Sequence, residues 1–202
     1  MEAYIKKHVN EDKTARGLMN YLNKHQYQQY FKFKELLLRK NVLQDFATYD
    51  TQFLLRFLRA RKFDLNLSLK MFTEYLEWNS QTDVPTLVSS SFPEEKRLKK
   101  FYPRAYHKTD KTGRPIYIEL ISQVDLDGVF NLVSEETLVN TVIRDYEYYL
   151  NSIIPSCSKV AGRPIEQSLC ILCVKEVSIS FTMKVKKILQ KTSKISQNYY
   201  PE

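Results

Sequence analysis

The spacing of apolar residues changes once along this chain, from a helical repeat to an extended one, and this change constrains the fold most. Up to about residue 79 the apolar side chains recur at helical intervals, which predicts amphipathic helices. Beyond residue 99 there are short alternating or continuous apolar stretches, typical of strands, followed by further helical patterns. We therefore predict an α/β protein with a helical N-terminal unit of three to four helices and an α/β domain after it.

The division into parts follows composition. We predict a polar N-terminal extension over 1–28, a helical domain over 29–80, a linker over 81–98 and the α/β domain over 99–202. The linker follows from the Ser, Thr and Pro in NSQTDVPTLVSSSFPE, residues 79–94. At 202 residues, 43% of them hydrophobic, the chain can build a core without disulfides or metal.

The helical part contains one strongly patterned segment, QFLLRFLRARKF, which Asp50 or Thr51 can cap. On a helical wheel its apolar residues share one face, and three basic residues, Arg56, Arg59 and Lys62, lie opposite, as on a solvated helix face. Arg61 falls on the apolar side and should therefore have a partner.

The second part begins with a hairpin, predicted from Tyr106 to Leu120 around a turn at 110–113. Ser134 can cap a helix over 135–150. The run Ser168 to Val174 is continuously apolar after its first residue, which predicts a strand covered on both faces, and a helix follows over about 180–194.

Charge and composition restrict the function. The formal net charge of +8 favours a polyanionic partner, either nucleic acid or an anionic membrane surface. The four glycines form neither a phosphate-binding loop nor a nucleophile elbow, so we expect no enzyme of those types. The three histidines are scattered and the three cysteines have no secretory signal before them, so we expect no metal site, no cofactor and reduced thiols. No apolar stretch is long enough to span a bilayer, and we expect a soluble intracellular protein.

The helix over 180–194 has a basic face formed by Lys184, Lys187, Lys191 and Lys194, with no acidic residue between Val177 and Pro201. These lysines can bind an anionic membrane surface transiently. An ordinary solvated helix face has the same pattern, and the spacing alone leaves both interpretations open.

Four phrases of the chain resemble the CRAL-TRIO lipid-binding family, and among its members the fungal-type phosphatidylinositol/phosphatidylcholine transfer proteins. They are LLRFLRARKFD (54–64), FYPRAYHKTDKTGRPIY (101–117), IPSCSKVAGRPIEQS (154–168) and ISQNYYPE (195–202), in the family's order. The resemblance implies a helical unit followed by a sheet that floors an apolar lipid cavity. It also implies phospholipid transfer without catalysis, in the cytoplasm, with peripheral association with Golgi or endosomal membranes.

The resemblance also implies site residues. Tyr106, Tyr117, Tyr146 and Ser168 match positions that contact a phosphatidylcholine headgroup, and Arg61, Lys62 and Glu202 match positions tied to phosphoinositide binding. Aromatic faces suit the choline cation, and hydroxyl and guanidinium groups suit phosphate. Without the family, the tyrosines could equally belong to the core, with each hydroxyl bonded locally.

The chain departs from the family in two ways. Cys170 and Leu172 replace a Thr and a Met, and Cys173 to Glu176 replace an Asp-Leu-Lys-Gly phrase, so the lipid specificity stays open. The family continues beyond ISQNYYPE, so we expect a fragment or a truncated product with impaired transfer.

Two other functions compete with phospholipid transfer. The chain could be a truncated remnant that acts only as a basic peripheral membrane or protein-interaction module. Nucleic-acid binding is disfavoured, because the aromatic residues fall on predicted core faces rather than in an exposed stacking row. The sequence does not indicate the oligomeric state.

Overall fold

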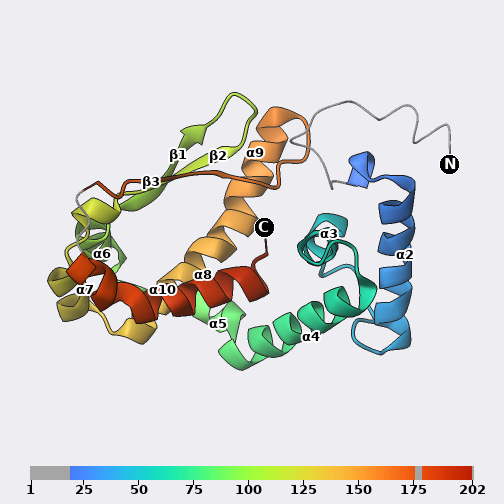
Figure 1. Cartoon of the computed structure of the whole chain (residues 1–202), viewed down its shortest axis with the longest axis horizontal. Helices are drawn as coiled ribbons and strands as arrows, with labels where there is room; N and C mark the ends of the chain where they lie inside the picture. The colour runs from blue at the N-terminus through green and yellow to red at the C-terminus, as the bar shows by residue number, and fades with distance from the viewer. Residues whose placement is uncertain (1–18, 176–178, 202) are drawn as a thin grey trace. The chain divides into compact units, whose positions relative to one another are not determined.

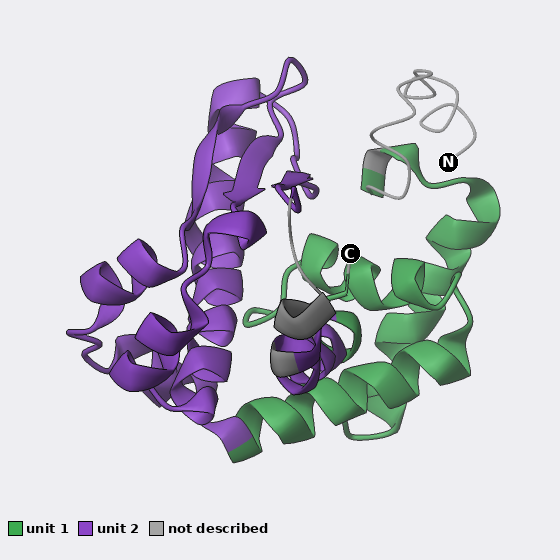
Figure 2. Ribbon diagram, turned by 60° about the vertical axis from the view of Figure 1, so that its left-hand side comes forward, with its two compact units in different colours: residues 1–81, 197–202 green, residues 82–196 purple. Residues whose placement is uncertain are grey.

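The computed structural model describes residues 19–175 and 179–201 (Figure 1). The chain divides into two compact units, residues 1–81 with 197–202 and residues 82–196 (Figure 2). Helices predominate and one three-stranded sheet lies in the second unit, which confirms the predicted α/β class.

The first unit is helical. It contains the short 3-10 helix η2 (Met19–Tyr21) and the helices α2 (Lys24–Arg39), α3 (Thr51–Ala60) and α4 (Leu65–Thr82). Asn23 and Gln26 form a reciprocal capping box at the start of α2. The predicted cap of α3 is confirmed, because the Asp50 carboxylate accepts a 2.7 Å hydrogen bond from the amide of Phe53.

Aromatic side chains fill the core of this unit. Phe33, Phe57 and Phe72 are fully buried, and the rings of Phe57 and Phe72 meet edge to face with their centroids 5.1 Å apart. The end of the chain joins this core: Tyr199 stacks on Trp78 at 4.2 Å, and Tyr200 meets the same indole edge-on. The aromatic pair in ISQNYYPE therefore serves packing in the helical unit.

The prediction that Arg56 faces solvent is wrong. Every residue from Leu54 to Leu58 is buried, and Arg56 is only 7% exposed, with its guanidinium 5.9 Å from the centroid of the Phe53 ring. A helix enclosed on all sides offers no solvated face to this turn, so the wheel does not apply there. Lys62, beyond the end of α3, is exposed as predicted.

The second unit contains both helices and the sheet. Its elements are α5 (Val84–Ser89), α6 (Glu95–Phe101), β1 (Arg104–Thr109), β2 (Pro115–Glu119), η3 (Ile121–Gln123), α7 (Leu126–Leu132), α8 (Glu135–Tyr148), the π-helical turn η4 (Tyr149–Ile153), α9 (Ile154–Ala161), β3 (Leu169–Leu172) and α10 (Ile179–Tyr199), whose last three residues belong to the first unit. The segment 81–98, predicted as a linker, holds α5 and the start of α6. Pro85 lies in the first turn of α5, where its missing N–H costs no hydrogen bond.

The sheet has the order β1-β2-β3, with β1 and β2 antiparallel and β2 and β3 parallel. The predicted hairpin is thereby confirmed. Tyr117 lies opposite Tyr106 on one side and Cys170 on the other. Residues that pair across strands share a face, so these three side chains form a row on one face of the sheet.

The expectation that the 168–174 strand is covered on both faces is wrong. In the described part of the chain β3 pairs with β2 alone, and all four of its residues are exposed, Ile171 to 46%. A continuous apolar run predicts burial only when other elements cover both faces, and here the run forms the edge of the sheet.

The hairpin turn is held by one carboxylate. Asp110 Oδ1 accepts hydrogen bonds from the amides of Thr112 and Arg114 at 2.8 and 2.9 Å, and Oδ2 accepts one from Arg114 Nε at 2.7 Å. Burial raises the pKa of Asp110, but the hydrogen bonds from Thr112 and Arg114 outweigh it and keep this pKa well below its ordinary value. The ionised carboxylate therefore stabilises the turn.

We predict that Asp110→Asn lowers the free energy of unfolding by about 1–3 kcal/mol at pH 7, because charge-assisted hydrogen bonds are lost. The lowered pKa means that this contribution is complete above the unfolded-state value of about 4 and disappears as the pH falls toward the folded-state value. Denaturant unfolding at pH 7 and pH 3 should show a smaller difference between the two proteins at pH 3, but not its complete loss, because pH 3 is still above the folded-state pKa. Asp127→Asn, on the exposed side of α7, is the matched control. If the free energies of unfolding of the unmodified protein and Asp110→Asn differ by the same amount at both pH values, the proposed role of the charge is contradicted.

Candidate functional site

Three tyrosines form a continuous aromatic surface on one face of the sheet. The rings of Tyr106 on β1 and Tyr117 on β2 have centroids 5.2 Å apart. Tyr149, from the π-helical turn η4, stacks on Tyr106 at 5.5 Å with an interplanar angle of 14°. The structure therefore brings Tyr106 and Tyr117 together as the sequence predicts, and adds Tyr149, which the sequence reasoning missed.

Tyr146 lies on α8, one turn before Tyr149, and its hydroxyl donates a 2.8 Å hydrogen bond to Ser196 Oγ on α10. Tyrosine hydroxyls are neutral at neutral pH, and burial raises the pKa of Tyr106, Tyr117 and Tyr146 further above the ordinary value of about 10. Ser168, the fourth predicted contact residue, is exposed and directly precedes β3.

A buried arginine lies beside the tyrosines. Arg104 Nη2 is 2.7 Å from Asp145 Oδ2 and donates a 2.9 Å hydrogen bond to Thr141 Oγ1, and both partners belong to α8. The guanidinium carbon of Arg104 lies 4.4 Å from the ring centroid of Tyr102. The Arg104 side chain is 10% exposed, so the ion pair joins β1 to α8 from inside the unit.

Glu119 completes this polar region at the end of β2. One carboxylate oxygen accepts a hydrogen bond from the Tyr102 hydroxyl and the other accepts a 3.3 Å hydrogen bond from the Tyr117 hydroxyl. Arg104 and Glu119 are paired in the sheet register. Arg104 lies two residues before Tyr106 on β1, and Glu119 lies two residues after Tyr117 on β2. Side chains two residues apart on a strand share a face, so the sequence could have predicted both residues on the tyrosine face.

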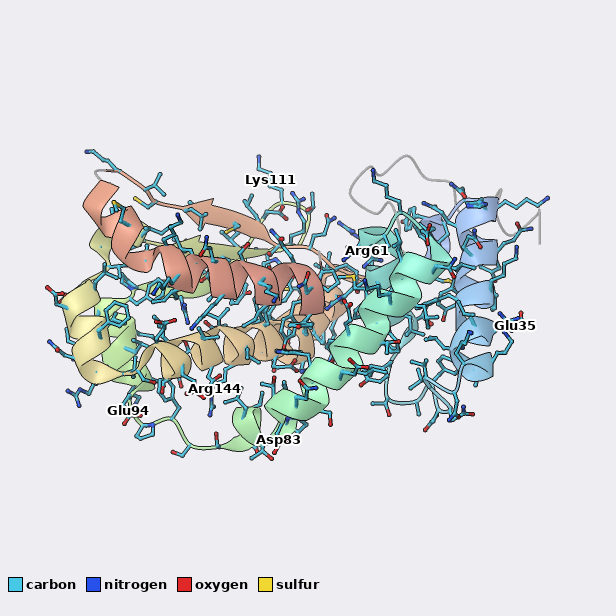
Figure 3. All side chains as sticks on the ribbon, turned by 60° about the horizontal axis from the view of Figure 1, so that its bottom comes forward. Glu35, Arg61, Asp83, Glu94, Lys111 and Arg144 are labelled. Carbon is cyan, nitrogen blue, oxygen red and sulfur yellow. The ribbon has the colours of Figure 1, made fainter. Side chains whose placement is uncertain are left out.

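Arg61 and Lys62, which the resemblance predicts for phosphoinositide binding, belong to the first unit. Arg61 ends α3, where its amide bonds to the carbonyl of Phe57 and its Nη1 donates a 3.2 Å hydrogen bond to the carbonyl of Ala60 (Figure 3). Lys62 follows in the left-handed region, with φ of 52°, and is exposed. Glu202 lies outside the described residues.

The predicted basic face is present on α10 as far as it is described. Lys187, Lys191 and Lys194 are exposed, as is Lys186, and Lys191 Nζ lies 2.5 Å from Glu135 Oε1 at the start of α8. The side chain of Lys184 is outside the description. Two apolar residues of this helix are also exposed, Met183 to 72% and Leu189 to 50%.

Within 19–175 and 179–201, no cluster of His, Cys, Asp and Glu has the grouping that holds a metal ion. None of the helices described there combines the length and the apolar character needed to cross a membrane. All three cysteines are free thiols.

Comparison with known proteins establishes the family. Residues 5–74 match the model of the CRAL/TRIO N-terminal domain. The CRAL-TRIO domain-containing protein YKL091C of Saccharomyces cerevisiae is 35% identical over 193 residues, which cover 92% of this chain and 61% of the relative. The SEC14 cytosolic factor of Kluyveromyces lactis is 41% identical over 154 residues, covering 76% of this chain and 51% of that protein.

A plant relative has a name that states a function. The phosphatidylinositol/phosphatidylcholine transfer protein SFH7 of Arabidopsis thaliana is 34% identical over 155 residues, covering 76% of this chain and 28% of the relative. The chain belongs to the CRAL-TRIO family, and its relatives include phospholipid transfer proteins. It spans about half the length of several curated relatives that it matches.

We predict that Tyr146→Phe lowers the free energy of unfolding by about 1 kcal/mol, because the hydrogen bond to Ser196 is lost. Ser196→Ala should have a similar effect, and the double variant should lose less than the sum of the two. Denaturant unfolding of the four proteins measures this coupling. Strictly additive losses would show that the two hydroxyls do not interact.

Proposed function

We propose that this chain binds a phospholipid headgroup at the tyrosine face of its sheet, and that it belongs to a phospholipid transfer protein acting without catalysis. The observation that supports this most is the aromatic surface of Tyr106, Tyr117 and Tyr149, flanked by the polar groups of Arg104 and Glu119. Aromatic faces attract cationic groups, while neutral hydroxyls can donate to phosphate.

The polar residues at this face argue against a purely apolar core. A structural core normally excludes charged groups, whereas this face holds Arg104, Asp145 and Glu119 within a few residues of the tyrosines. Burying charged groups at the tyrosine face costs desolvation energy, and charged groups with this cost are common in binding sites. The names of the relatives point to phosphatidylinositol and phosphatidylcholine as the lipids.

The α10 helix would make the contact with the membrane. Its exposed lysines would be attracted to an anionic surface, and Met183 and Leu189 could enter the interface. The relatives named as cytosolic factors support a cytosolic protein that meets membranes transiently, and we place it at Golgi or endosomal membranes by analogy alone. In the first unit, Arg61 and Lys62, with Glu202, would contribute to phosphoinositide binding.

We predict that phospholipid co-purifies with the chain at about one molecule per chain, and that Tyr106→Ala with Tyr117→Ala reduces this severalfold. Mass spectrometry of extracted lipids measures both. Tyr148→Ala is the matched control, because Tyr148 is exposed on α8. Absence of phospholipid from the unmodified chain would refute lipid binding and favour a basic peripheral membrane or protein-interaction module.

We also predict that Lys187→Gln with Lys194→Gln weakens binding to phosphatidylserine-containing vesicles by about tenfold at low salt, since each basic residue near such a surface contributes up to ~1 kcal/mol. The difference should nearly vanish near 1 M salt, where the screening length is about 3 Å. Lys24→Gln with Lys32→Gln, exposed on α2, is the control pair. If the control pair weakens vesicle binding as much as the α10 pair does, the basic face of α10 has no specific role in membrane binding.

A further inference from the structure

Arg104 is held as a bound cation would be held. Its guanidinium has an aromatic face on one side, from Tyr102, and a carboxylate and a hydroxyl on another, from Asp145 and Thr141. Aromatic rings combined with carboxylates form the usual surroundings of organic cations in proteins. The cation bound in this place is therefore a side chain of the protein itself.

A second carboxylate lies close to this ion pair. Glu119 pairs with Arg104 in the sheet register, and its two oxygens accept hydrogen bonds from the hydroxyls of Tyr102 and Tyr117. The Asp145 side chain is 44% exposed, so a ligand from solvent can reach it. Without Arg104 this region would combine two carboxylates with the Tyr102 ring, and such a combination of groups can recognise a quaternary ammonium group.

We infer that Arg104 determines headgroup specificity: its guanidinium fills the place that the Tyr102 ring and the Asp145 carboxylate, beside the tyrosine face, would otherwise offer to a quaternary ammonium group, and so disfavours choline headgroups. This inference rests on the proposed function, because it concerns the headgroup preference of the same site. The preference itself can be measured with a soluble headgroup, whether or not the chain binds a whole phospholipid.

Arg104 disfavours a choline headgroup at this site for both a steric and an electrostatic reason. Arg104 is fixed by its contacts with Tyr102, Thr141 and Asp145, so it cannot move aside without losing an ion pair and a hydrogen bond. Its positive charge also repels a second cation brought to the Tyr102 ring and the adjacent carboxylates. A headgroup without a cation meets no such repulsion, and the site therefore favours uncharged or anionic headgroups over choline.

The test uses phosphocholine as the probe and isothermal titration calorimetry as the measurement, on the full chain. Arg104→Ala removes both the charge and the bulk, and Arg104→Gln removes the charge alone. We expect Arg104→Ala to bind phosphocholine at least about tenfold more tightly than the unmodified chain, with Arg104→Gln between them. Arg104→Lys, which keeps the positive charge, should resemble the unmodified chain. Arg97→Gln, exposed on α6, is the control for a general loss of positive charge.

A gain of affinity separates this role from a merely structural one, since loss of a structural ion pair does not create binding of a choline group. Circular dichroism checks folding, and if Arg104→Ala does not fold, Arg104→Gln decides the question. Equal phosphocholine affinity in the folded variant and the unmodified chain, or no binding to either, would overturn the inference. An equal gain from Arg97→Gln would overturn it as well.

A second measurement distinguishes failure of this inference from failure of the proposed function. Each protein is incubated with vesicles of phosphatidylcholine and phosphatidylinositol, and the extracted lipid is identified by mass spectrometry. The inference expects the ratio of phosphatidylcholine to phosphatidylinositol to rise about tenfold in the Arg104 variant. An unchanged ratio with lipid bound would overturn the inference alone. No lipid in any protein would refute the proposed function, and the phosphocholine titration would still decide the inference.

Discussion

The ion pair between Arg104 and Asp145 is the contact on which the candidate site depends. It joins β1 to α8, so it sets the distance between the sheet and the helix that carries Tyr146 and leads into Tyr149. Removing one partner of such a pair leaves an uncompensated charge in a poorly solvated place, at a cost of about 3–5 kcal/mol when fully buried. Because Asp145 is partly exposed, the cost here should be smaller, and variants at Arg104 can be expected to fold.

The alternation of side chains along β1 and β2 places the residues of the candidate site on one face of the sheet. Arg104 and Tyr106 share a face with Tyr117 and Glu119 because side chains alternate along each strand and pair across the ladder. Cys170 extends the row on β3 with a sulfhydryl group. A thiol is a weaker donor, so the end of the row next to Ser168 offers less to a phosphate than the tyrosines do.

Much of this arrangement could be predicted from the sequence, and the exceptions have two causes. The Asp50 and Ser134 caps and the hairpin depend on residues close in sequence, and they were predicted correctly. Arg56 and the 168–174 run were misjudged, because burial depends on which distant elements cover a surface. Arg104 and Glu119 were missed for another reason: the strand period places them on the tyrosine face, but their partners, Asp145 and Tyr102, are distant in sequence, and no local pattern predicts those contacts.

The α10 helix connects the functional surfaces of the second unit. On one side Ser196 accepts the hydrogen bond from Tyr146, and Val185 and Ile188 are buried. On the other side Lys187 and Lys194 are exposed together with Met183. The hydrogen bond between Tyr146 and Ser196 is a direct link between α8, beside the tyrosine face, and the buried side of this helix. The same helix therefore contributes both to the packing around the candidate site and to the exposed basic surface.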